Sequence, residues 1–160
     1  MTNASFILIN TNPFLDIPTP KSPKMIEVSG IGIPKPQPVN KEFNEILNRR
    51  SKNILISFGS VAKSIYMDNE MKSEILKTIK KFPDITFIWK YETPEDGHGS
   101  GVDNLVLSKW VPQNDLLNDE RLTLFITHGG MGSITEVAFS NVPALAIPIF
   151  GELMIAIYND

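Results

Sequence analysis

The chain has 160 residues, of which 42% are hydrophobic and 21% are charged, and its formal net charge at pH 7 is −3. This length fits one domain, and the composition excludes wholesale disorder. The acidic balance, without a long run of Lys or Arg, argues against a nucleic-acid partner, and the lack of cysteine excludes disulfides, thiolate metal sites and a cysteine nucleophile.

The first forty residues hold seven of the chain's twelve prolines. Proline lacks a backbone N–H and fixes φ, so this segment cannot form a long helix or a central strand. We predict two short strands here, at residues 5–10 and 25–28, within an extended connector. Because such connectors commonly link domains, we expect another domain upstream in the full protein.

From residue 41 onward, short apolar strands alternate with helices. Helices are predicted at residues 41–48, 68–82, 112–117 and 132–139, and strands at residues 54–58, 86–91, 104–107, 124–127 and 144–149. This alternation indicates βαβ units, and continuous apolar runs are typical of parallel strands covered on both faces. The fold class is therefore α/β, a doubly wound parallel sheet that is incomplete in this chain.

Neither end of the chain predicts a membrane segment. The apolar run at residues 6–9 is too short for the core of a signal peptide. The apolar stretch at residues 142–157 is interrupted by two prolines, a glycine and a glutamate, whereas a membrane span needs about 20 mostly apolar residues. We expect no membrane span in this chain.

Ligands bind beyond the carboxyl ends of the strands in an open parallel sheet, and three strand ends here carry informative residues. The last of these ends runs through His128 and a glycine-rich turn, with Gly130 and Gly132, directly into a helix. Free backbone N–H groups and the positive helix end would meet there, which favours an anion such as phosphate. His128 could donate to a phosphate oxygen.

The same turn has a second interpretation. Ser133 and Glu136 match a capping box, in which the pair closes the start of the helix. The segment is neither a Walker P-loop nor a full G-x-G-x-x-G motif, because Thr135 occupies the last glycine position. From these residues alone, phosphate binding and helix capping both stay open.

The other two strand ends are also open to two interpretations. Trp110 could stack on a base whose edge Gln113 hydrogen-bonds, or it could be a core tryptophan beside a helix started by proline. Ser60 could place its hydroxyl beside a phosphate, or the strand could simply turn at the preceding glycine. His98 lies in a loop that looks solvated and has no evident metal-ligand partners, so no metal site is predicted.

Together these residues resemble the UDP-glycosyltransferase family, especially animal UDP-glucuronosyltransferases of the nematode type. The similarity covers nearly the whole chain and is strongest at residues 54–60, 87–90, 110–117, 125–130 and 148–151. The family has a GT-B fold, in which two Rossmann-like domains face each other across a cleft. The resemblance implies that residues 1–40 are the end of the N-terminal domain and the interdomain linker. Residues 41–160 would be the UDP-sugar-binding domain, truncated at its C-terminus.

The resemblance also implies the roles of individual residues. Trp110 would stack on uracil with Val111 beside it, Gln113 would contact the uridine, and Glu136 would bond the ribose hydroxyls. The diphosphate would be held by Ser60, His128, Gly130, Gly132 and Ser133. The implied reaction is an inverting, metal-independent transfer from UDP-glucuronate or UDP-glucose, without another cofactor, to a small lipophilic acceptor. The full-length family resides in the membrane and lumen of the endoplasmic reticulum.

Two departures from the family lead us to expect an inactive fragment. The family's catalytic base is a histidine of the N-terminal domain, and neither His98 nor His128 matches it, so no catalytic residue is expected in this chain. Glu152 and Leu153 stand where the family has Asp-Gln to hold the sugar hydroxyls. Glu152 could still accept a hydrogen bond from the sugar, but a leucine cannot. The alternative is a non-catalytic pseudoenzyme or interaction module that associates with full-length relatives.

Overall fold

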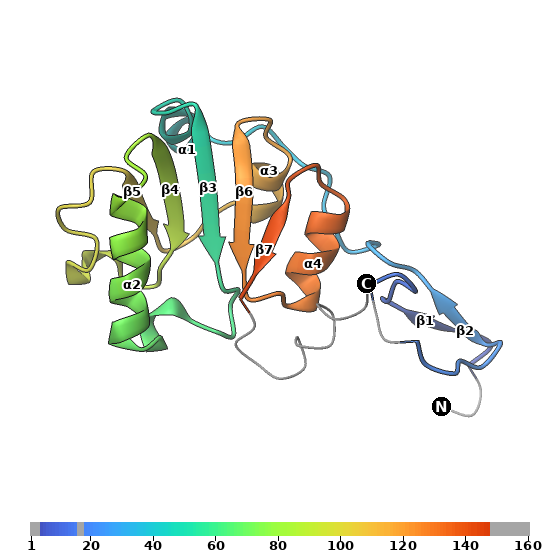
Figure 1. Cartoon of the computed structure of the whole chain (residues 1–160). Coiled ribbons are helices and arrows are strands. Elements are labelled where there is room, and N and C mark those ends of the chain that lie inside the picture. Colours follow the sequence, from blue (N-terminus) through green and yellow to red (C-terminus); the bar gives the residue numbers. More distant parts are fainter. Residues whose placement is uncertain (1–3, 16–17, 148–160) are drawn as a thin grey trace.

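The computed structural model describes residues 4–15 and 18–147, and its centre is a five-stranded parallel sheet (Figure 1). The strands lie in the order β5-β4-β3-β6-β7. The chain thus first adds β4 and β5 on one side of the central β3 and later adds β6 and β7 on its other side. Their bounds are β3 (Lys52–Ser57), β4 (Ile85–Lys90), β5 (Leu105–Ser108), β6 (Leu122–Thr127) and β7 (Ala144–Ala146). The predicted doubly wound α/β sheet is confirmed.

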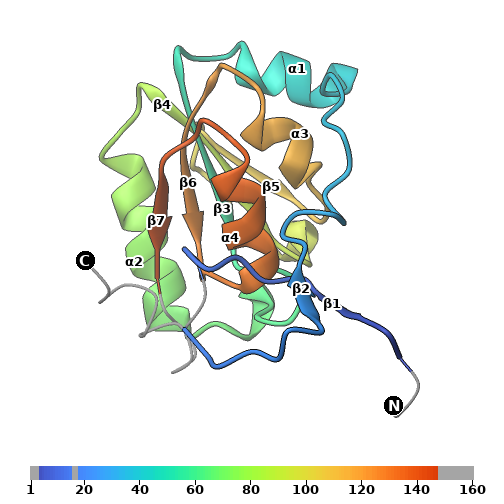
Figure 2. The same ribbon diagram turned by 90° about the vertical axis from the view of Figure 1, so that its right-hand side faces the viewer.

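Helices cover both faces of this sheet. In Figure 2, α2 lies on one face, and α1, α3 and α4 lie on the other. Because crossovers between parallel strands are right-handed, connections that run in opposite directions across the sheet place their helices on opposite faces. The helices are α1 (Lys41–Leu47), α2 (Asn69–Lys80), α3 (Gln113–Leu117) and α4 (Met131–Ala138), with short 3-10 turns η1 (Ser64–Tyr66) and η2 (Pro94–Asp96).

The strands bury both of their faces, in two separate hydrophobic clusters. Leu55 pairs in register with Ile88 on one side and Phe125 on the other, and all three pack in the cluster that includes α1 and α3. One residue earlier in β3, Ile54 pairs with Phe87, and both belong to the cluster that includes α2. This two-sided burial is the reason for the continuous apolar runs in the sequence.

The proline-rich segment contains a second, smaller sheet. β1 (Ile7–Ile9) and β2 (Met25–Glu27) pair in parallel outside the main sheet, and Figure 1 shows them projecting from its end. Both strands were predicted, although each is shorter than expected. The connector that follows runs along α3, where the Asn114 amide donates to the carbonyl of Pro34 at 2.9 Å and Asp115 accepts from the N–H of Gln37 at 2.8 Å.

The remaining predicted elements are confirmed within the described residues. The helices at 68–82, 112–117 and 132–139 correspond to α2, α3 and α4 with shifts of one or two residues at their ends. The last predicted strand begins at Ala144 as expected but ends at Ala146, before Ile147, and the final two residues of its predicted range lie outside the described part of the chain. Across residues 4–15 and 18–147, no helix combines the length and apolar character that a bilayer crossing requires.

Replacing Phe125 with alanine should lower the free energy of unfolding by about 3–5 kcal/mol, because the ring is completely buried between the sheet and its helices. Leu145→Ala, on the neighbouring strand β7, is the matched control. Its side chain is 52% exposed, so its effect should stay within about 0.5 kcal/mol. Urea unfolding followed by circular dichroism measures both changes, and similar losses for the two variants would contradict this description of the core.

Candidate functional site

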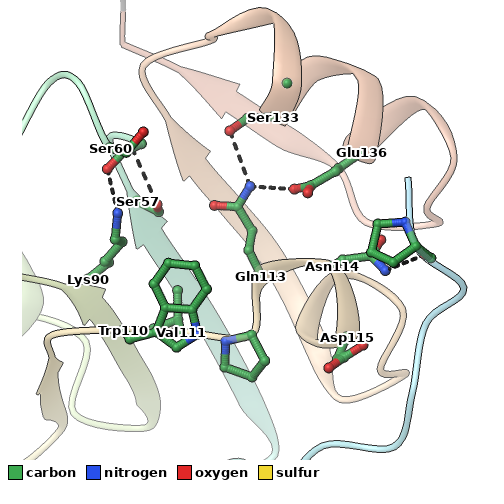
Figure 3. Close-up of a pocket in the computed structure, with 14 residues that line it drawn as sticks. Ser57, Ser60, Lys90, Trp110, Val111, Gln113, Asn114, Asp115, Ser133 and Glu136 are labelled. Carbon is green, nitrogen blue, oxygen red and sulfur yellow. Dashed lines mark hydrogen bonds between the residues drawn. The ribbon is translucent and has the colours of Figure 1, made fainter. Parts of the chain in front are cut away.

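A cavity of about 520 Å³ lies at the carboxyl edge of the sheet (Figure 3). This size falls within the range of small-molecule sites in proteins. Its walls come from the ends of β3 and β4, the segment after β5, the connector beside α3, and the first turns of α3 and α4. The lining residues are Pro34, Ser57, Gly59, Ser60, Lys90, Trp110, Val111, Pro112, Gln113, Asn114, Asp115, Gly132, Ser133 and Glu136.

Most of the residues predicted to bind UDP line this one cavity. They are Ser60, Trp110, Val111, Gln113, Gly132, Ser133 and Glu136. His128 and Gly130 do not line it. The imidazole of His128 instead packs against Gly59, which does. Glu152 lies outside the described residues, so its predicted contact with the sugar stays a prediction.

The amide of Gln113 joins α3 to α4 at one end of the cavity. Its nitrogen donates to Oγ of Ser133 at 3.2 Å and to Oε2 of Glu136 at 2.5 Å, as Figure 3 shows. The amide is therefore held in one orientation. Its carbonyl oxygen accepts no hydrogen bond from the described residues and can serve as an acceptor for a ligand.

The capping-box interpretation of the glycine-rich turn is wrong. Helix α4 begins at Met131 with Gly130 as its N-cap, and a glycine has no side chain with which to cap the helix. Ser133 therefore lies inside the first turn, and both Ser133 and Glu136 bond Gln113 instead of the helix start. Among the described residues, no side chain accepts a hydrogen bond from the first backbone N–H groups of α4, so the positive end of the helix is able to attract an anion.

The core-tryptophan interpretation of Trp110 is also wrong. Its side chain is 73% exposed, whereas Trp89 on β4 is the buried tryptophan, at 1% exposure. The Nζ atom of Lys90 lies 5.9 Å from the centre of the Trp110 ring, a cation–π contact. A large flat apolar surface thus stands open at the cavity, available for stacking.

Lys90 is the main site residue that the sequence reasoning missed. It is the last residue of β4, and its ammonium group donates to the carbonyl of Gly59 at 2.6 Å while it lines the cavity. The sequence could have indicated Lys90 by its position, because a charged residue that ends an apolar strand lies at the same edge of the sheet as the other strand ends. Lys90 adds a positive charge on the side of the cavity that also carries Ser60 (Figure 3).

His128 is half-buried, and its surroundings favour the neutral imidazole. Burial lowers the pKa of its imidazole, and the positive charge of Lys90 lowers this pKa further. Its Nδ1 atom is buried and has no hydrogen-bond partner among the described residues. A neutral imidazole offers one donor and one acceptor.

Within residues 4–15 and 18–147, no three His, Asp or Glu side chains gather where they could hold a metal ion.

Among solved structures, the fold resembles a UDP-glucosyltransferase from Polygonum tinctorium with a TM-score of 0.70 and 22% identity, over 95% of this chain and 36% of that chain. It also resembles LpCGTa, solved in complex with UDP, with a TM-score of 0.67 and 24% identity, over 96% of this chain and 37% of that chain. At this level of identity the likeness concerns the fold. It agrees with a Rossmann-like half of a GT-B glycosyltransferase.

Sequence similarity identifies the family. The putative UDP-glucuronosyltransferase ugt-55 of Caenorhabditis elegans is 35% identical over 93% of this chain and 29% of its own length. UDP-glucuronosyltransferase 1A7 of Rattus norvegicus is 33% identical over 92% of this chain and 27% of its own length, so the chain spans under a third of these relatives. The family model described as "UDP-glucoronosyl and UDP-glucosyl transferase" matches residues 1–159. The chain belongs to this family of UDP-sugar-dependent transferases.

Proposed function

We propose that this chain is the donor-binding part of a UDP-glycosyltransferase, and that its cavity holds the uridine diphosphate of a UDP-sugar. One observation carries the proposal. An exposed indole, an amide paired with a carboxylate, and a positively charged end line the same cavity. These three features suit, in turn, a flat base, a ribose and a diphosphate. The UDP-bound structure of LpCGTa, which shares the fold, supports this choice of ligand.

The uridine would lie between Trp110 and Gln113. Stacking on an aromatic side chain contributes about 1–3 kcal/mol per base. The free carbonyl oxygen of Gln113 can accept the N–H of uracil, and Val111 lines the same cavity as the indole. Glu136 would accept hydrogen bonds from the ribose hydroxyls, because only one of its two carboxylate oxygens is bonded to Gln113.

The diphosphate would lie between Ser60 and Lys90 on one side and the start of α4 on the other. The hydroxyl of Ser60 and the backbone N–H groups of Gly132 and Ser133 supply neutral donors, and Lys90 supplies a positive charge. As the bond between the sugar and UDP breaks, negative charge accumulates on the diphosphate. Donors already fixed around that charge can lower the barrier by several kcal/mol.

The reaction of the whole protein would be an inverting, metal-independent transfer of glucuronate or glucose to a small lipophilic acceptor. We propose that residues 41–160 bind the donor, with Glu152 toward the sugar, and that residues 1–40 end an acceptor-binding domain that also supplies the catalytic base. The exposed apolar side chains of the β1–β2 pair, such as Leu8 and Ile26 at 61% and 41%, support a continuation of that small sheet. The family suggests residence in the endoplasmic reticulum.

Trp110→Ala should weaken UDP binding about tenfold or more, because it removes the stacking surface for the base. Tyr66→Ala is the matched control, since Tyr66 is an equally exposed aromatic residue, at 79%, that does not line the cavity. Isothermal titration calorimetry with UDP measures both. An unchanged affinity in Trp110→Ala, or no binding of UDP at millimolar concentration by the folded wild-type chain, would contradict the proposal.

Lys90→Gln should weaken UDP binding about tenfold and weaken uridine binding less, because the diphosphate carries the charge that Lys90 attracts, whereas uridine would meet Lys90 only through the Trp110 ring that its ammonium group contacts. The same substitution should raise the pKa of His128 toward its ordinary value, since the repulsion from Lys90 disappears while the burial remains. Calorimetry with UDP and with uridine tests the first effect, and an NMR titration of the imidazole tests the second.

Lys63→Gln provides the control for net charge. Lys63 is exposed and lies in the loop between the cavity and η1, but it does not line the cavity. An equal loss of UDP affinity in the Lys63 and Lys90 variants would mean that general electrostatic attraction, rather than a specific contact, holds the diphosphate.

A further inference from the structure

His128 occupies a slot between two glycines. A Cβ atom built on Gly59 would lie 2.7 Å from Cε1 of the imidazole, and one built on Gly130 would lie 2.5 Å from Nε2 and 2.8 Å from Cε1. Carbon atoms in favourable contact are about 3.5–4.0 Å apart, so either Cβ would overlap the ring. The ring can occupy this place because both neighbours lack a side chain.

The two glycines differ in what the backbone demands of them. Gly59 has φ of +82°, a conformation that favours glycine whatever surrounds it. Gly130 has φ of −58° and ψ of 143°, which other residues adopt without strain. At position 130, the reason for glycine is therefore the space that the imidazole fills.

The slot places the imidazole directly behind the wall of the cavity. Gly59, which the ring touches, lines the cavity, and its carbonyl accepts from Lys90. Gly130 is the N-cap of α4, the helix whose first turn lines the cavity through Gly132 and Ser133. The ring thus lies between the two elements that would hold the diphosphate.

We propose that Gly130 is a positioning residue. Together with Gly59 it forms a slot that fixes the imidazole of His128 beside the diphosphate end of the cavity. Gly130 acts through His128 rather than through its own N–H group. The presence of a diphosphate beside the imidazole rests on the proposed function, whereas the position of the imidazole between the two glycines does not.

An added methyl group at position 130 should move the ring rather than unfold the protein. The atoms that it would meet belong to the end of the His128 side chain, and a displaced imidazole becomes more exposed to water. Since burial is the main cause of the lowered pKa of His128, displacement should raise this pKa toward its ordinary value. Gly130→Ser adds the same Cβ while it retains a good N-cap residue, so it guards against an effect of Ala on the helix start.

The first experiment is an NMR titration of the histidine Cε1–H signals without any nucleotide. The chain has two histidines, and loss of one signal in His128→Ala assigns them. We expect the pKa of His128 to rise in both Gly130→Ala and Gly130→Ser. It should not change in Gly132→Ala, because a Cβ on Gly132 would meet no atom within 4 Å. If the pKa of His128 is unchanged in both Gly130 variants, the proposal that Gly130 makes room for the imidazole is wrong.

The second experiment is a double-mutant cycle on UDP affinity, measured by calorimetry with variants whose fold is verified by circular dichroism. Gly130→Ala and His128→Ala should each weaken binding about tenfold, because moving or removing the ring shifts the wall formed by Gly59 and the start of α4 and costs about one hydrogen bond between that wall and the diphosphate. The double variant should bind no more weakly than His128→Ala alone. If Gly130→Ala causes the same loss in the absence of His128, the positioning role is wrong.

The two experiments separate the slot from the proposed function. A wild-type chain that fails to bind UDP would refute the proposed function, while the nucleotide-free titration would still decide whether Gly130 seats the ring. If the wild-type chain binds UDP and the effects of Gly130→Ala and His128→Ala on UDP affinity simply add in the double variant, the proposed function is supported and the role of Gly130 is refuted.

Discussion

The parallel alignment of the strands is the constraint on which the whole site depends. Because β3, β4, β5 and β6 run in one direction, their carboxyl ends meet at one edge, and each strand delivers its following residues there. The connection from β5 to β6 then crosses the sheet and places α3 beside α4. This crossover brings Gln113 within hydrogen-bonding distance of Ser133 and Glu136, although twenty or more residues separate them in the chain.

The charged and polar side chains of the cavity are sorted along its length. Glu136 and the amide of Gln113 lie at one end, and Lys90 and Ser60 lie toward the other, with Trp110 open along the side (Figure 3). A ligand that is neutral over its base and ribose and anionic over its diphosphate matches this order. The arrangement also shows why a net charge of −3 is compatible with an anionic ligand. Binding depends on the few charges and helix ends that face the ligand, and these contribute little to the total.

Glycine has a different role at each position around the site. At Gly59 the positive φ turns the chain after β3, at Gly130 the missing side chain makes room for His128, and at Gly132 the surroundings are open. The third position leaves bare backbone at the cavity wall, which a ligand can approach closely. A glycine-rich motif therefore combines a turn, a packing contact and a ligand surface, and only the neighbours of each glycine distinguish them.

The sequence by itself determined the secondary structure, the fold class and most of the cavity wall. Apolar runs and helical periodicity are local, so the helix predicted at 68–82 was found as Asn69–Lys80, and the rule that strand ends share an edge placed Ser60, Trp110 and Gln113 together. Only the tertiary structure decided that Trp110 is exposed while Trp89 is buried, that Ser133 and Glu136 bond Gln113 rather than cap a helix, and that Lys90 enters the cavity. The physical reason is the same each time: burial and hydrogen-bond partners depend on which surfaces meet across the sheet, and residues distant in sequence supply those surfaces.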